Sequence, residues 1–202
     1  AQGFHPAVWS YGHRNLLGIA FDAKGALWEQ EMGPKGGDEV NLIQAGRNYG
    51  WPLHTSGINY DGRPVDVSRS LGITLDAKDV EFPVLDLTPS PALSSFVFYA
   101  GKAFPEWQGN ILVGTLRATD LLRLEVVDNR VVHTEVLLKD LARFRDIETA
   151  AAQARAVRFG DGKGRTDGDC CVKCVTAGGQ GFQPGHGGCR MGAGDSHLSG
   201  SA

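Results

Sequence analysis

The stretch YGHRNLLGIAFDAKGALWEQEMGPKGGDEVNLIQAGRNYGWP, residues 11 to 52, carries the strongest fold signal in this chain. Its apolar runs at 18–21 and 26–31 lie on either side of DAKG, where Asp and Gly favour a tight turn between two strands. A third run at 38–43 ends in a turn rich in Gly, Asn and Pro. The stretch therefore predicts a β-hairpin followed by a third strand.

The same pattern of short strands and turns continues to about residue 147. Further strands are expected at 96–101, 110–116, 121–127 and 131–138. The last two form a second predicted hairpin, because their apolar residues alternate. Helical periodicity is nearly absent, and 150–159 is the one segment with the propensity for a short helix.

Short strands joined by Gly and Pro turns, with few helices, predict an all-β sandwich, barrel or propeller. The long loop at 52–80 favours a propeller with functional loops on one face. Blades of roughly 40 to 50 residues would number about three in the first part of the chain, too few to close a ring. We therefore expect residues 1–149 to form a partial β-propeller of about three blades.

The composition changes at about residue 150. Residues 150–202 are rich in Gly, Ala, Arg and Cys, and no strand or core pattern is expected there, so we predict an irregular tail that is disordered or read out of frame. The spacing of Cys171, Cys174, His186 and Cys189 matches a zinc knuckle. The flanking residues lack apolar side chains that would pack a small zinc domain, so the spacing alone is weak evidence.

Bulk composition excludes several classes of partner. The 202-residue chain is 42% hydrophobic, has a formal net charge of -3 and contains no run of Lys or Arg, so nucleic acid is not an expected partner. No apolar stretch approaches the roughly 18 residues of a membrane-spanning helix, which predicts a soluble protein. The chain begins AQGFHPAVWS, without Met or a signal core, so we expect the natural N-terminus to lie upstream.

The segment GPKGGDE (33–39) has the composition of a cation site. Gly33 and Pro34 force a turn, and the two later glycines can adopt positive φ, so carbonyl oxygens can converge beside Asp38 and Glu39. Calcium prefers such oxygen ligands. A plain surface hairpin loop has the same composition, so both interpretations stay open.

Two motifs that contain arginine suit anions. Arg14 and Asn15 place a fixed cation beside an amide, suited to a carboxylate or quinone oxygen or to a structural ion pair. In RFRD (143–146), a strand would turn Arg143 and Arg145 to the same side. That pair would form a clamp for a polycarboxylate, or solvated charges at a strand edge.

Three segments together resemble the glucose/sorbosone dehydrogenase family: residues 12–52, FVFYAGKAFPEWQGNILVGTLRATDLLRL (96–124) and RFRDIE (143–148). The similarity covers about residues 10 to 148 in the family's order. It implies a six-bladed β-propeller and a soluble, periplasmic aldose sugar dehydrogenase that uses pyrroloquinoline quinone (PQQ) and calcium. Such an enzyme oxidises the C1 hydroxyl of an aldose sugar and delivers electrons to an external acceptor.

The resemblance also implies roles for individual residues. Arg14 and Asn15 match the family's pair near the quinone, and Arg14 and Asp38 are implied as catalytic groups. The carbonyl oxygens of Gly33 and Pro34 match those that hold the catalytic calcium. Further cofactor contacts are implied for Met32, Thr88, Arg117, Arg143 and Arg145. A second, structural calcium is expected near Tyr60 and Glu81.

The chain departs from the family pattern at several positions. The family's catalytic His lies well upstream of the Arg-Asn pair, and His5 and His13 are too close to that pair to replace it, so we expect this chain alone to be inactive. Met32 stands where the family has His or Gln, and Asp86 where Trp is usual. The expected Asp-Gly turn and closing strand do not follow Glu148. A non-catalytic β-propeller or carbohydrate-binding module is therefore the alternative.

Overall fold

The computed structural model describes residues 3–102, 104–149 and 157–159. Within these residues the protein is all-β apart from short helical turns. The strands are β1 (Leu16–Phe21), β2 (Leu27–Glu31), β3 (Asp38–Ile43), β4 (Leu85–Leu87), β5 (Leu93–Phe98), β6 (Ile111–Thr115), β7 (Leu121–Val127), β8 (Arg130–Leu138), β9 (Ile147–Thr149) and β10 (Val157–Phe159). The helical turns are α1 (Ser68–Leu71), η1 (Ala77–Asp79) and η2 (Pro105–Trp107).

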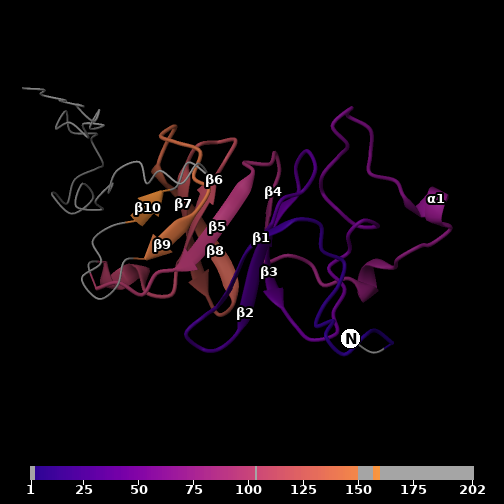
Figure 1. Ribbon diagram of the computed structural model, residues 1–202, viewed down its shortest axis with the longest axis horizontal. Helices are drawn as coiled ribbons and strands as arrows, with labels where there is room; N and C mark the ends of the chain where they lie inside the picture. The colour runs from indigo at the N-terminus through magenta and orange to yellow at the C-terminus, as the bar shows by residue number, and fades with distance from the viewer. Residues whose placement is uncertain (1–2, 103, 150–156, 160–202) are drawn as a thin grey trace, which may run out of the picture.

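Strands β1 to β4 form the first antiparallel sheet, in chain order (Figure 1). The β1–β2 hairpin turns at Asp22, whose Oδ1 accepts the backbone N–H groups of Lys24 and Ala26 at 2.9 and 2.8 Å. Trp28 Nε1 donates to Asp22 Oδ2 at 3.2 Å, which ties the turn to a core residue of β2. Between β3 and β4 the chain makes a long excursion that carries α1 and η1.

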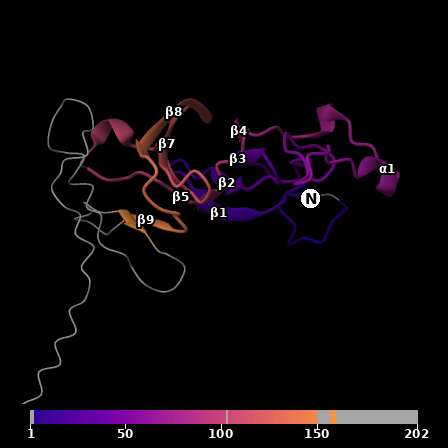
Figure 2. The same cartoon turned by 90° about the horizontal axis from the view of Figure 1, so that it is seen from above.

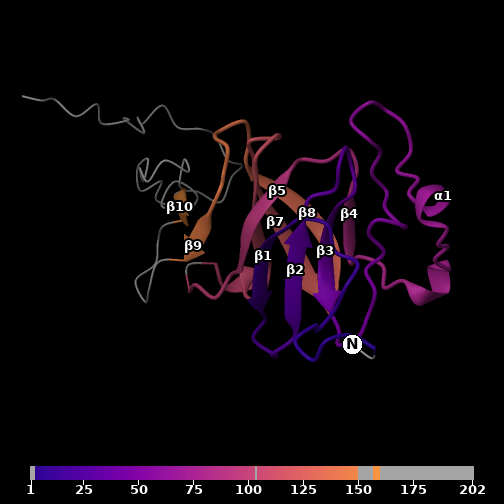
Figure 3. The ribbon, with the colours of Figure 1, turned by 45° about the vertical axis from the view of Figure 1, so that its right-hand side comes forward.

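Strands β5 to β8 form a second four-stranded antiparallel sheet, again in chain order, and β9 pairs with β10. The β7–β8 hairpin turns at Asp128 and Asn129, with φ values of 48° and 61°. This left-handed backbone matches the twist of the flanking strands in a tight hairpin. Figure 3 shows β1, β2 and β3 in front of the second sheet.

The sheets lie side by side as successive layers, with β9–β10 beyond the second sheet (Figures 1 and 2). The main core fills the space between the two large sheets and contains Trp28, Val40, Leu93, Phe96, Ile111, Val113, Leu122 and Leu124. A Cβ at Gly18 would lie 2.8 Å from the Phe96 ring, so glycine lets β1 approach β5 closely. The other face of the second sheet packs a separate cluster of Phe104, Trp107, Leu112, Leu121, Phe144 and Ile147.

Packed four-stranded meanders of this kind are typical of propeller blades. The all-β prediction is therefore confirmed, whereas the number of blades stays a prediction. No helix among the described residues is long and apolar enough to span a bilayer.

Most strand predictions are confirmed, two of them with unchanged bounds at Asp38–Ile43 and Leu121–Val127. Strand β5 begins earlier than expected, at Leu93, because Leu93 and Ser94 are buried and Leu93 pairs with Thr115. The serines there interrupt the apolar pattern, which concealed the start of the strand.

Two predictions about the end of the described region are wrong. Residues 143–146 are not a strand: Phe144 N–H donates to Thr115 O at 3.2 Å, and β9 begins only at Ile147. Val157–Phe159 is strand β10, paired with β9, rather than the end of a helix, so a strand exists within the tail. The zinc-knuckle residues lie outside the described residues.

Candidate functional site

One end of the two large sheets opens into a cleft. In an antiparallel pair the start of one strand meets the end of its partner, so Leu16 lies opposite Glu31 and Leu93 opposite Thr115. The segments before β1 and β5 and after β2 and β6 therefore meet at this end. Together with part of the β3–β4 excursion, they enclose a cavity of about 730 Å³.

Seven residues that the sequence singled out line this cleft: Arg14, Asn15, Met32, Gly33, Pro34, Tyr60 and Arg117. The remaining lining residues are Lys35, Gly36, Pro89, Ser90 and Ala92. The fold thus brings together predicted site residues from both large sheets.

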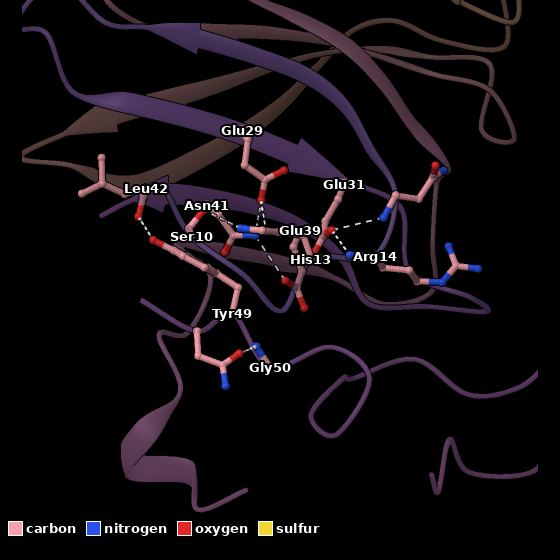
Figure 4. A network of polar contacts seen from close by, with 12 residues as sticks. Ser10, His13, Arg14, Glu29, Glu31, Glu39, Asn41, Leu42, Tyr49 and Gly50 are labelled. Carbon is pink, nitrogen blue, oxygen red and sulfur yellow. Dashed lines mark hydrogen bonds and ion pairs between the residues drawn. The ribbon is translucent and has the colours of Figure 1, made fainter. Parts of the chain in front are cut away.

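The guanidinium of Arg14 lies at the floor of the cleft. Its Nη1 donates to the carbonyl oxygens of Met32 and Gly33 at 2.7 and 3.0 Å. The backbone N–H groups of Arg14 and Asn15 donate to Glu31 Oε2 at 2.6 and 3.3 Å (Figure 4). These contacts fix the pair against the end of β2, while the side chain of Met32 also faces the cleft.

The glycine-rich loop after β2 forms one wall. Gly36 and Gly37 have positive φ values of 101° and 67°, as expected for a loop that only glycine builds without strain. Gly33 packs so closely against the carbonyl oxygens of Gly36 and Gly37 that any Cβ would overlap them. Carbonyl groups therefore converge in this loop, as the sequence predicted.

Asp38 lies beneath the loop and does not line the cleft. Its Oδ1 accepts the Gly33 N–H at 3.1 Å, and its Oδ2 accepts the Leu93 N–H at 2.9 Å. Burial raises the pKa of Asp38, although these hydrogen bonds oppose the shift. The structure thus places this residue as an anchor between the loop and β5, away from the position of a reacting group.

Three cationic side chains line the cleft: Arg14, Lys35 and Arg117. Arg117 Nη1 donates to Ser90 O at 2.8 Å, which holds it against the second sheet. The described lining residues include no acid, so the cleft favours a ligand that carries carboxylates. Lys35 was missed as a site residue, and its place inside the glycine-rich loop was the available signal.

Thr88 and Asp86 lie beside the loop. Thr88 Oγ1 accepts the Gly37 N–H at 2.8 Å and donates to Asp86 Oδ1 at 3.0 Å. Thr88 therefore supports the loop from behind and does not line the cleft. Asp86 is exposed on β4, where it pairs in register with Glu39.

Tyr60 and Glu81, expected to share a calcium, are placed in different surroundings. Tyr60 is exposed and lines the cleft. Glu81 accepts from Gln44 Nε2 at 3.3 Å and lies 3.6 Å from Arg47 Nε. The described residues therefore give no support to a shared metal site at this pair.

The predicted arginine clamp is also outside the cleft. Arg143 and Arg145 are both exposed, on either side of the buried Phe144. Among the described lining residues there is no histidine: His5 is exposed near the N-terminus, and His13 contacts Ser10 and Glu29 behind the floor of the cleft.

Fold and cleft together define an all-β, propeller-like protein with a basic site at the ends of its sheets. The chain belongs to the glucose/sorbosone dehydrogenase family, whose sequence model, described as Glucose / Sorbosone dehydrogenase, matches residues 1–165. This match extends past residue 148, where the resemblance first traced from the sequence ends, and includes β10.

Individual relatives agree with this assignment. The aldose sugar dehydrogenase YliI of Escherichia coli is 39% identical over 150 residues, which is 73% of this chain and 39% of that protein. A solved glucose dehydrogenase superposes with a TM-score of 0.70 at 39% identity over 78% of this chain and 44% of its own. The PQQ-bound aldose sugar dehydrogenase of Streptomyces coelicolor gives a TM-score of 0.58 at 26% identity, covering 85% and 46% of the two chains. This chain thus spans less than half the length of these relatives.

Proposed function

We propose that this chain forms the cofactor-binding part of a PQQ-dependent aldose sugar dehydrogenase that oxidises the C1 hydroxyl of its sugar and delivers electrons to an external acceptor. The observation that carries the proposal is the basic cleft that gathers Arg14, Lys35 and Arg117 beside the glycine-rich loop. The similarity of the chain to sugar dehydrogenases, one of which was solved with PQQ bound, supports the choice of cofactor.

The residues present fit a flat, polyanionic cofactor. A volume of about 730 Å³ lies within the range of small-molecule sites. Arg14 precedes β1 of the first sheet and Arg117 follows β6 of the second, so the two guanidinium groups can hold carboxylates of one ligand. The Arg14 guanidinium lies 5.3 Å from the centre of the Trp51 ring, which limits its orientation.

We propose that calcium binds at the same wall of the cleft. Gly33 and Pro34 are lining residues, and calcium at Gly33 O would displace Arg14 Nη1, which donates to that oxygen at 3.0 Å. Backbone carbonyls are ligands that calcium prefers, but it takes six to eight oxygens, so others must come from outside this pair. Bound PQQ would supply the two-electron acceptor, and Arg14 would stabilise negative charge on its oxygen atoms.

The described cleft offers a binding site without a histidine base. A proton acceptor with a pKa near neutrality is needed to remove the proton of a sugar hydroxyl. We therefore infer that this chain binds the cofactor and that turnover requires residues contributed by the remainder of a full-length family enzyme.

Titration of the metal-free chain with PQQ, with and without Ca²⁺, tests this proposal through intrinsic tryptophan fluorescence, to which Trp51 beside Arg14 contributes. Arg14→Ala and Arg117→Ala should each weaken binding by about 10- to 100-fold, because each removes a charge-assisted hydrogen bond. Arg130→Ala, at an exposed position of the β7–β8 hairpin, is the control for the change in charge and should bind like wild type.

Equal PQQ affinity in all four proteins would refute the assigned cleft. Sugar binding by the chain in the absence of PQQ and calcium, with no PQQ binding, would instead support the non-catalytic carbohydrate-binding alternative. Met32, a half-buried lining residue in place of the usual His or Gln, makes that comparison informative.

A further inference from the structure

A second cluster of polar side chains lies on the first sheet, behind the floor of the cleft (Figure 4). Glu29 and Glu31 alternate on β2, and Glu39 and Asn41 alternate on β3, so all four point to one face. Register places Glu29 opposite Asn41 and Glu31 opposite Glu39. Their exposed fractions are only 0, 3, 8 and 0% for Glu29, Glu31, Glu39 and Asn41. Three carboxylates therefore share one buried surface.

Little positive charge faces these carboxylates from the described residues. Arg14 contributes its backbone N–H to Glu31, but its guanidinium turns away to the carbonyls of Met32 and Gly33. The imidazole of His13 is the cationic candidate, with Nδ1 3.5 Å from Glu29 Oε1. Buried carboxylates need a compensating positive charge or a proton, and the described residues supply too little positive charge to balance this cluster.

His13 is oriented by two neighbours. Its Nε2 lies 2.8 Å from Ser10 Oγ, and its ring stacks on Tyr49 with the centroids 4.7 Å apart. In the tautomer in which the Ser10 hydroxyl accepts the Nε2–H, Nδ1 is unprotonated and can bind a metal ion. Metal-binding histidines are commonly fixed in this way, with the second ring nitrogen donating to a neighbouring oxygen.

Unpaired atoms converge at the same place. His13 Nδ1, Glu29 Oε2 and Asn41 Oδ1 are buried and have no hydrogen-bond partner among the described residues. The other oxygen of Glu29 accepts from Asn41 Nδ2 at 2.7 Å, so the two side chains are held in place while their second polar atoms stay available. Buried polar atoms are rarely left without a partner, and an ion bound between His13 and Glu29 would satisfy the first two of these atoms.

Ligand atoms of His13, Glu29 and Glu31 lie within 4.8 Å of one another. Zinc binds nitrogen and carboxylate oxygen at about 2.0 to 2.2 Å, so the ligand atoms of a tetrahedral ion lie roughly 3.4 Å apart, and side-chain rotations must bring the three groups about 1 Å closer together. We propose that His13, Glu29 and Glu31 bind a divalent transition-metal ion of the zinc class. An imidazole among few oxygens suits such an ion better than calcium, which takes six to eight oxygens.

The ion has a structural role in this arrangement. It joins the segment before β1, which carries His13, to strand β2, which carries both glutamates. Because Arg14 follows His13 directly, the same bond limits the movement of the guanidinium at the cleft floor. The site is therefore separate from the cofactor cleft and is expected to support it from behind.

The test is a calorimetric titration of the metal-free full chain with Zn²⁺. The chain should carry Cys171→Ser, Cys174→Ser, His186→Gln and Cys189→Ser, because those residues offer a second set of zinc ligands. One Zn²⁺ should bind and raise Tm, and His13→Gln or Glu29→Gln should abolish both effects. Ser10→Ala should weaken binding by about 10- to 100-fold through the loss of the histidine's orientation.

Glu106→Gln is the matched control, since Glu106 is exposed on η2. Glu29→Gln removes a buried charge, so the Tm of the metal-free variant should equal or exceed that of metal-free wild type. This result would show that the variant folds and that its loss of zinc binding comes from the missing ligand. Substitution with Co²⁺ should give visible absorption bands that His13→Gln removes. Zinc binding unchanged by His13→Gln and Glu29→Gln, no binding in folded wild type, or binding of Ca²⁺ in preference to Zn²⁺ would each overturn the proposal.

Discussion

At the residue scale, the clearest effect of burial on a carboxyl pKa is at Glu39. Loss of hydration raises its pKa from 4.5 to about 8, helped by the nearby charges of Glu31, Asp86 and Glu29 and opposed by a hydrogen bond from Asn41. Folded Glu39 thus keeps a proton that the unfolded chain has lost across this interval. Unfolding releases that proton, so the free energy of unfolding contributed by Glu39 is largest below pH 4.5 and falls as pH rises to about 8.

The change that tests this is Glu39→Gln in metal-free protein. The difference in unfolding free energy between wild type and variant should change by up to about 1.4 kcal/mol per pH unit within that interval, with wild type losing stability as pH rises. Chemical denaturation at several pH values measures it. Glu106→Gln should preserve the wild-type slope, and a flat difference for Glu39→Gln would contradict the raised pKa.

At the element scale, the β1–β2 hairpin depends on the side chain of Asp22. Burial raises its pKa, but hydrogen bonds from Ala26, Trp28 and Lys24, together with the charge of Lys24, outweigh that effect and lower it overall. Asp22→Ala removes three acceptor contacts and should lower the free energy of unfolding by about 1 to 3 kcal/mol.

Thermal and denaturant melts would measure this loss. Asp128→Ala, in the turn of the β7–β8 hairpin, serves as a comparison because no side-chain hydrogen bond is described for Asp128. Its positive φ of 48° adds backbone strain to the variant. An unfolding free energy of Asp22→Ala equal to that of wild type would contradict the prediction and would show that the first hairpin does not depend on the Asp22 side chain.

Element boundaries were predictable where they depend on local chemistry. Asp and Gly at 22–25 mark the first turn, and alternation at 121–127 marks a strand with one buried face. Residues 143–146 were mispredicted because exposed arginines around one phenylalanine look like strand alternation. Their position is decided by the burial of Phe144 against the second sheet.

At the scale of the whole molecule, strand β1 presents an apolar edge. Leu17, Ile19 and Phe21 alternate along it and are 41, 63 and 69% exposed, while the intervening Gly18 faces the core. An exposed apolar face on an edge strand promotes association. The isolated chain should therefore self-associate at micromolar concentration.

Light scattering with size-exclusion chromatography can test this association. Ile19→Lys combined with Phe21→Lys should shift the chain toward monomer. Ala23→Lys combined with Thr134→Lys adds the same charge at exposed positions and should leave association nearly unchanged. A monodisperse wild-type monomer would contradict the prediction.

The sequence by itself determined most of the strands of the two large sheets, the first hairpin turn and the glycine-rich loop, because turn chemistry, alternation and positive φ are local properties. It also placed Arg14 and Arg117 among the cofactor candidates. Only the tertiary structure showed which candidates meet: pairing of strand ends brings Arg14 and Arg117 to one cleft, but leaves Asp38 beneath it and Glu81 elsewhere. The same folding buries Glu29 and Glu31 against His13, since side-chain proximity across strands depends on register and packing rather than on sequence spacing.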